Sequence, residues 1–267
     1  MNGPVAQCVA LVCHGNAVLG GRRGIYFHGN STARFCETVG FAEAAPGGAA
    51  APLAESPDAW FAWLARGGFA GLRLGRAAQD RPLGSDRMTA GFVGGGEVWT
   101  IGALRQGGAG EAWQGYWQVW NRQAPGQRIW RVTYVRAAAP APADADTLAA
   151  ARAELSAALA DIHAFAERND SGGFAGNFAQ ARAALAGAPA APRGFHRDLA
   201  PEGTLGADAL AVLDACQHAS VFGGMGSWND QTFAGAAGEA YERVSERLFR
   251  ALNRAIAAAA NESCRAG

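Results

Sequence analysis

The chain contains no lysine, and all of its 23 basic residues are arginines. P-loop nucleoside triphosphatases, protein kinases and pyridoxal or Schiff-base enzymes each need a lysine in the active site. The sequence therefore excludes these classes of enzyme. No other motif in the chain indicates one particular reaction.

Net charge and long apolar runs are also lacking. The 23 arginines are balanced by 23 acidic residues, and they are spread along the chain rather than gathered in a stripe. A nucleic-acid backbone normally requires a basic stripe, so we expect no nucleic-acid partner. No window reaches the length of a membrane span, and the apolar stretch near the start is too short for a signal peptide. We expect a soluble, cytoplasmic protein that does not bind membranes.

Cysteine is scarce, and the chain has no CxxC spacing. The five cysteines are Cys8, Cys13, Cys36, Cys216 and Cys264. An odd count without a CxxC pair argues against a disulfide framework and against a structural zinc site. We therefore expect free thiols, no bound metal and no cofactor.

Apolar residues make up 49% of the chain, enough for a substantial core. Tracts rich in Ala, Pro and Gly occupy residues 44–52, 137–144 and 186–202, and the apolar pattern changes character at the second tract. The prediction is an α+β protein. Residues 1–137 are expected to form a mainly antiparallel β-rich region with one short helix, and residues 145–263 a four-helix region packed on it. The two regions together can also form one compact domain.

The first region shows short apolar runs separated by turn residues. The predicted strands cover residues 5–13, 24–28, 32–41, 69–74, 98–104, 112–121 and 128–136. Short connections favour antiparallel pairing. The one predicted helix begins after Ser56, a typical N-cap, and ends at Gly67.

A hairpin is predicted around Pro125-Gly126, which is typical of a type II turn. A symmetric loop would pair Trp117 with Tyr134 and Asn121 with Trp130. Trp120 beside Arg131 suggests a cation–π contact. We expect one face of this hairpin to be covered by a helix or a second subunit; the alternative is an aromatic wall that binds a ligand.

The tripeptide His-Gly-Asn occurs twice, beginning at His14 and at His28. Gly and Asn both suit tight turns, so two similar hairpin turns explain the repeat. The alternative is that the two histidines and Cys13 converge on a metal ion or form a thiol–imidazole pair. His196-Arg197-Asp198 is a further polar tripeptide, which we interpret as a solvated loop.

Helical periodicity begins after residue 144. The predicted helices run to residue 168 from a cap at Asp146-Thr147, and then over residues 174–186, 207–221 and 230–261. Asp214 and His218 lie one turn apart on the third of these, which favours a helix-stabilising pair over a catalytic one.

The glycine-rich segment before the last helix is the least ordinary part of the chain. We interpret residues 222–230 as a structural turn whose Trp228 is buried and whose polar side chains cap the last helix. The alternative is a ligand or partner site. The candidate residues in this segment are Gly224, Gly226, Ser227, Trp228, Asn229 and Asp230. The spacing matches neither GxGxxG nor GxxxxGK(S/T), so a phosphate-binding loop is poorly supported.

The leading functional hypothesis is a non-catalytic protein that binds a protein partner or forms a homo-oligomer. It rests on the absence of a recognisable catalytic motif. The alternative is a lysine-independent hydrolase or transferase with a cleft between sheet and helices. Convergence of His14, His28 and Asp230 in the folded chain would favour that enzyme.

Overall fold

The chain begins with α1 (Gly3–Leu19), a helix that is buried along most of its length. The computed structural model describes residues 1–25, 27–44, 50–77, 85–106, 108–137, 146–187 and 196–264. Asn2 caps α1 by accepting a hydrogen bond from the backbone N–H of Val5. The strand predicted for residues 5–13 is therefore wrong. A helix buried on every side has no polar face, so its sequence lacks the period that indicates a helix.

Six strands form one mostly antiparallel sheet in the order β2-β1-β6-β5-β4-β3, and the β1–β6 contact is parallel. The strands are β1 (Cys36–Ala44), β2 (Ala50–Ala54), β3 (Phe69–Ala77), β4 (Val98–Arg105), β5 (Gly108–Val119) and β6 (Trp130–Ala137). β2 lies in a tract expected to be irregular, because Ala and Pro carry little strand signal. Residues 27–35, parts of two predicted strands, form turns and the 3₁₀ helix η1 (Ser31–Ala33).

Helices α1 and α2 (Pro57–Arg66) pack on the same face of the sheet. The predicted cap of α2 is confirmed, since Ser56 Oγ accepts a hydrogen bond from Ala59 N–H. The Trp60 ring stacks on Phe41 at 4.2 Å between centroids. A Cβ atom on Gly15 would lie 2.3 Å from Leu72 Cδ1, so glycine at this position lets α1 approach the sheet closely.

The free edge of β3 is closed by two asparagine side chains. Asn16, from α1, accepts a hydrogen bond from Leu72 N–H at 2.6 Å and donates to the Leu72 carbonyl at 2.9 Å. Asn261 makes the same pair of bonds with Leu74, at 2.7 and 3.0 Å. Each amide thus satisfies the backbone as a neighbouring strand would, which removes an open edge.

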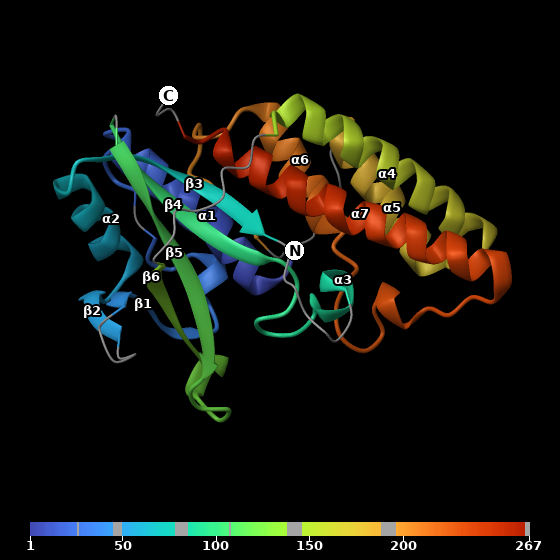
Figure 1. The fold of residues 1–267 in the computed structure, drawn as a ribbon, viewed down its shortest axis with the longest axis horizontal. Helices are drawn as coiled ribbons and strands as arrows, with labels where there is room; N and C mark the ends of the chain where they lie inside the picture. The colour runs from blue at the N-terminus through green and yellow to red at the C-terminus, as the bar shows by residue number, and fades with distance from the viewer. Residues whose placement is uncertain are drawn as a thin grey trace.

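Five further helices are α3 (Asp86–Thr89), α4 (Leu148–Arg168), α5 (Gly172–Leu185), α6 (Ala207–His218) and α7 (Gly235–Asn261). Figure 1 shows α4 to α7 side by side to the right of the sheet. The described part of the region before residue 137 holds three α-helices, α1, α2 and α3, and not the one short helix expected, whereas α7 packs against β3 as the expected packing of helices on the sheet requires. Residues 138–145 and 188–195, in two of the expected irregular tracts, lie outside the described residues. None of the described helices is both long and apolar enough to cross a membrane.

Candidate functional site

The predicted turn at residues 222–230 is anchored in the helical core by Trp228. The Trp228 side chain is fully buried, and its indole N–H donates to Ser245 Oγ at 2.7 Å. The Tyr241 hydroxyl donates to the Trp228 carbonyl at 2.6 Å. Phenylalanine rings of α4 and α5 contact the indole; these are Phe165, Phe174 and Phe178. The predicted burial of Trp228 is confirmed, and it leaves the indole no free face for a ligand.

The polar residues of this segment do not cap the last helix, as the sequence had suggested. Ser227 Oγ accepts from Asn229 N–H and thereby caps the 3₁₀ helix η3 (Trp228–Asp230). Asp230 accepts from the backbone N–H of Gly226, whose φ of +79° favours glycine. The last helix begins only at Gly235, and no side chain caps it. The prediction failed because the polar residues turn back on their own loop.

The same segment touches a second glycine-rich loop, which contains Gly91. A Cβ atom on Gly91 would lie 2.3 Å from the backbone carbon of Gly223 and 2.6 Å from the nitrogen of Gly224, so the backbones touch. The exposed Met225 follows directly, and Phe92, on the other loop, is 66% exposed. Apolar side chains that stand in solvent on two touching loops are a typical feature of a contact surface.

The two His-Gly-Asn tripeptides do not form two hairpin turns. His14 lies within α1, whereas His28 is exposed in a turn in which Gly29 has a φ of +82°. Among the described residues, the structure shows no hydrogen bond or ion pair that joins His14, His28 and Asp230. The convergence that would have favoured an enzyme is therefore not observed.

A different cluster brings together all three tripeptides noted in the sequence. The Asp198 carbonyl lies 3.1 Å from His14 Nε2 and accepts from Asn30 Nδ2 at 2.7 Å. The Asp198 carboxylate accepts from Ser31 N–H at 2.7 Å and also from the Ser31 hydroxyl. His196 Nδ1 lies 2.9 Å from Ser31 Oγ. We call these five residues the polar clasp. Asn30 and Asp198 are 168 positions apart, so no local pattern could have revealed the clasp.

The polar clasp is not arranged as a catalytic triad. A hydroxyl has one hydrogen and a carboxylate only accepts, so the Ser31 hydroxyl donates to Asp198 and accepts from His196 Nδ1–H. In a triad the imidazole would instead take the proton of the serine. Burial lowers the pKa of both His14 and His196, which favours their neutral forms. The clasp thus ties the loop at residues 196–198 to the turn at residues 28–31.

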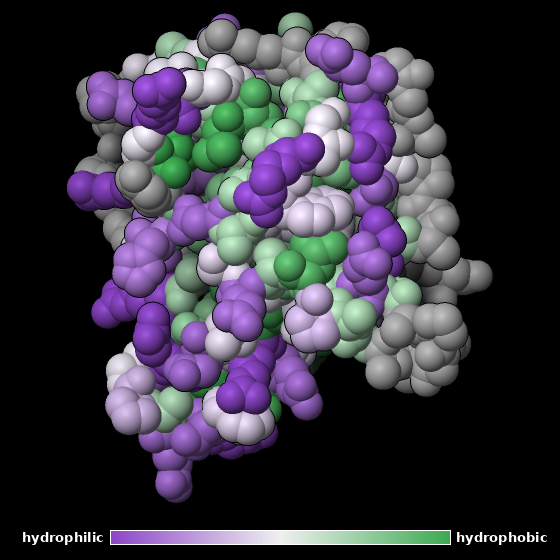
Figure 2. Space-filling view, turned by 90° about the vertical axis from the view of Figure 1, so that its left-hand side faces the viewer, coloured by the Kyte–Doolittle hydropathy of each residue, from purple (hydrophilic) through white to green (hydrophobic). Residues whose placement is uncertain are grey.

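The β5–β6 hairpin forms, with a register that differs from the predicted one. Trp117 pairs with Val132 and Gly115 with Tyr134. The loop is centred one residue before Pro125-Gly126, which shifts the pairing by two residues and keeps each side chain on its expected face. The predicted cation–π contact is confirmed, because the Arg131 guanidinium lies 3.1 Å from the centre of the Trp120 ring. Trp120 is nevertheless 55% exposed. Figure 2 shows the hairpin end, at the bottom of the view, as mainly hydrophilic.

The hairpin extends past the end of β4 and leaves one edge of β5 open (Figure 1). Within the described residues, β4 pairs with β5 only as far as Gln114. Trp120 N–H bonds to Ile129 on the β6 side, so by strand alternation the backbone groups of Trp117 and Val119 face away from β6. They bond to no other backbone group in the described part of the chain. Among the described residues, the β5 edge at Trp117 and Val119 therefore lacks the kind of cover that Asn16 and Asn261 give the β3 edge.

An apolar groove of about 340 Å³ runs beside the open edge. Its apolar walls include Val5, Phe92, Val93, Trp99, Tyr116 and Trp117. Glu97 also lines the groove and forms an ion pair with Arg76 at 3.0 Å, and burial raises the pKa of the Glu97 carboxyl. Phe92, Val93 and Tyr116 are exposed, and the two tryptophans are partly buried. The groove thus combines unpaired backbone groups with aromatic walls.

The cysteines agree with the expectation of free thiols, because none of the five forms a disulfide. Burial raises the pKa of Cys8 and of Cys36 to about 11. Among the described residues, no three His, Cys, Asp or Glu side chains are grouped so that they could hold a metal ion.

Comparison of the chain with protein-family models, with curated proteins and with solved structures finds no match. The geometry of the open β5 edge and of the polar clasp is therefore the basis for assigning a function.

Proposed function

We propose that this is a non-catalytic cytoplasmic binding protein that docks an extended segment of a protein partner against the open edge of β5. The observation that carries the proposal is the unpaired backbone of Trp117 and Val119 beside the apolar groove. An extended peptide can add a strand to such an edge, with backbone hydrogen bonds supplying affinity and side-chain pockets supplying specificity.

The contrast between the two sheet edges supports this function. Asn16 and Asn261 close the edge of β3, which is what proteins do with an edge that must not pair. No described residue covers the β5 edge in this way, and aromatic side chains stand beside it. Tyr and Trp are the residue types most enriched where proteins bind partners. The absence of a disulfide among the five cysteines, all of which the structure describes, is in keeping with a reducing compartment.

A hydrolase is the less well supported alternative. Ser31 contacts His196 beside a hollow, but its hydroxyl donates to Asp198 and is not activated by the imidazole.

The test begins with a phage-displayed library of random linear peptides selected on the immobilised protein. Synthetic copies of the selected peptides are then titrated by fluorescence polarisation. We expect Phe92→Ser to weaken binding about tenfold, because the exposed ring forms one wall of the groove. Val119→Pro should also weaken binding, since it removes one edge N–H. The matched control is Leu210→Ser on α6, which changes another exposed apolar residue and should bind normally.

Equal binding by all three variants would show that the groove is not the site. Light scattering of the protein alone distinguishes a second copy from a different partner. A dimer that Phe92→Ser dissociates would mean that the groove is filled by another copy of this chain.

A further inference from the structure

The two faces of the sheet differ in chemistry at the open β5 edge. Trp117 lines the groove together with Val5 of α1, so its side chain lies on the face of the sheet on which α1 packs. Side chains alternate along a strand, which places Gln118 and Trp120 on the opposite face. Arg131 pairs with Gln118 across the hairpin and therefore shares this second face. One face of the edge is thus apolar, and the other carries a guanidinium.

The Arg131 guanidinium is held in place beside the edge. It lies 3.1 Å from the centre of the Trp120 ring, and this exposed indole directly follows the last residue of β5. Arg131 forms no ion pair with any described residue, and its buried Nε–H has no hydrogen-bond partner among them. The charge therefore has a fixed position and lacks an acidic partner in the described part of the chain.

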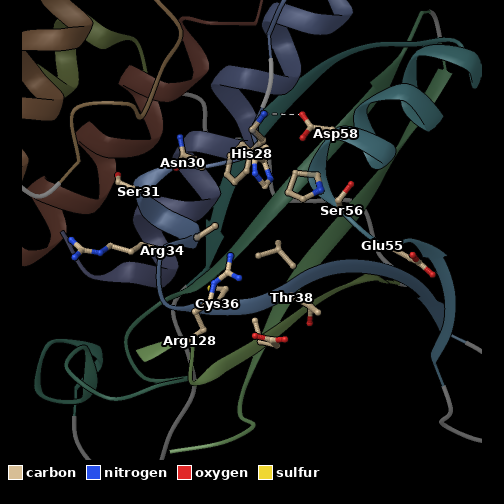
Figure 3. Close-up of a pocket in the computed structure, with 16 residues that line it drawn as sticks. His28, Asn30, Ser31, Arg34, Cys36, Thr38, Glu55, Ser56, Asp58 and Arg128 are labelled. Carbon is tan, nitrogen blue, oxygen red and sulfur yellow. Dashed lines mark hydrogen bonds between the residues drawn. The ribbon is translucent and has the colours of Figure 1, made fainter. Parts of the chain in front are cut away.

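No acidic residue of the hairpin balances this charge. Residues 112–137, which span the hairpin, contain four arginines and no Asp or Glu. Arg136 forms ion pairs with one glutamate of β1 and one of β5. Arg128 lines a separate hollow on the β1 side of the hairpin (Figure 3). Arg131 is thus the charge beside the open edge, and the exposed Arg122 in the hairpin loop adds to the positive potential of this end.

We propose that the segment docked on β5 alternates apolar residues with Asp or Glu. This inference rests on the proposed function and names the chemistry of the partner. An added strand places successive side chains on opposite faces, so one set enters the groove and the other set meets Arg131, whose paired N–H donors suit a carboxylate. Glu97 in the groove does not oppose such a segment, because its charge is balanced by the ion pair with Arg76.

The test uses the peptides selected from the random library on the immobilised protein. We expect their sequences to carry an excess of Asp and Glu at every second position, between apolar residues. Each selected peptide is then compared with a copy in which Asp and Glu are replaced by Asn and Gln. In fluorescence polarisation at low salt, the amide copy should bind about tenfold more weakly. The difference should shrink at high salt, because salt screens exposed charges.

Variants of the hairpin locate the charge that is responsible. Arg131→Gln should reduce the preference for the acidic peptide over its amide copy to about twofold or less, whereas Arg131→Lys keeps the charge and should retain most of it. Arg128→Gln is the matched control, since it removes an arginine of the same hairpin on the side away from the open edge, and it should leave the preference unchanged. Phe92→Ser should weaken both copies by the same factor, because it changes the groove and not the charged face.

The outcomes separate this inference from the proposed function. If the peptides bind through the groove but the acidic and amide copies bind equally, or if Arg131→Gln retains the preference, the inference is wrong and the proposed function stands. If no peptide binds, or if Phe92→Ser leaves binding unchanged, both are wrong. A dimer in light scattering that the acidic peptide fails to displace would also overturn the inference, since a second copy would then occupy the edge. Thermal melting shows whether each variant is folded.

Discussion

Replacing Asn16 by alanine should destabilise the fold by about 2 to 6 kcal/mol. Asn16 is buried, and its amide satisfies both Leu72 N–H and the Leu72 carbonyl. Alanine would leave these two backbone groups without partners, and each such loss costs about 1 to 3 kcal/mol. The higher helix propensity of alanine offsets at most about 0.7 kcal/mol. Urea unfolding with linear extrapolation measures the change in the free energy of unfolding, provided that the m value is unaltered.

Asn261→Ala provides the internal comparison, because it removes the same kind of bonds from Leu74 at a partly exposed position. Water can replace part of that contact, so we expect a smaller loss than for Asn16→Ala. Asn121→Ala, in the exposed hairpin loop, should change stability by less than about 1 kcal/mol. The reasoning would be refuted if Asn16→Ala cost no more than either of these substitutions.

Three further changes have defined outcomes. Burial lowers the pKa of His14 and His196, so on acidification these histidines take up protons in the unfolded chain before they do in the folded chain. The free energy of unfolding should therefore fall as the pH drops below about 6.5. His14→Gln should make this pH dependence weaker in urea titrations at several pH values. Ser245→Ala leaves the buried Trp228 N–H without a partner and should cost about 1 to 3 kcal/mol by the same assay, whereas a neutral result would contradict the buried bond. Gly91→Ala places a Cβ atom 2.3 Å from the backbone of the facing loop, so its melting temperature should fall by several degrees; an unchanged value would show that the loops do not touch.

The elements with one polar face were the ones that the sequence could predict. Helix α2 has a cap at Ser56, and α4 has one at Thr147, and both were placed nearly correctly. Helix α1 was mistaken for a strand because its apolar residues continue around the whole helix, so no period distinguished the two structures. The parallel contact of β1 with β6 depends on a long connection whose path leaves no local signal.

The candidate sites were predicted only in fragments. The contact between Trp120 and Arg131 follows from strand pairing, so it was foreseen. The polar clasp was not, because Asp198 and Ser31 meet through the tertiary fold and each tripeptide alone is typical of a turn. The open edge of β5 depends on where β4 stops pairing, and strand ends are poorly marked in sequence.

Amide hydrogen exchange at Trp117 and Val119 is the most direct test of the proposed binding edge. In the protein alone, both amides should exchange rapidly, while that of Gln118, which faces β6, should be protected. A selected peptide bound at saturating concentration should protect Trp117 and Val119 and leave Gln118 unchanged. If the peptide binds and these two amides still exchange as fast as before, no strand has been added to β5 and the proposed function is wrong.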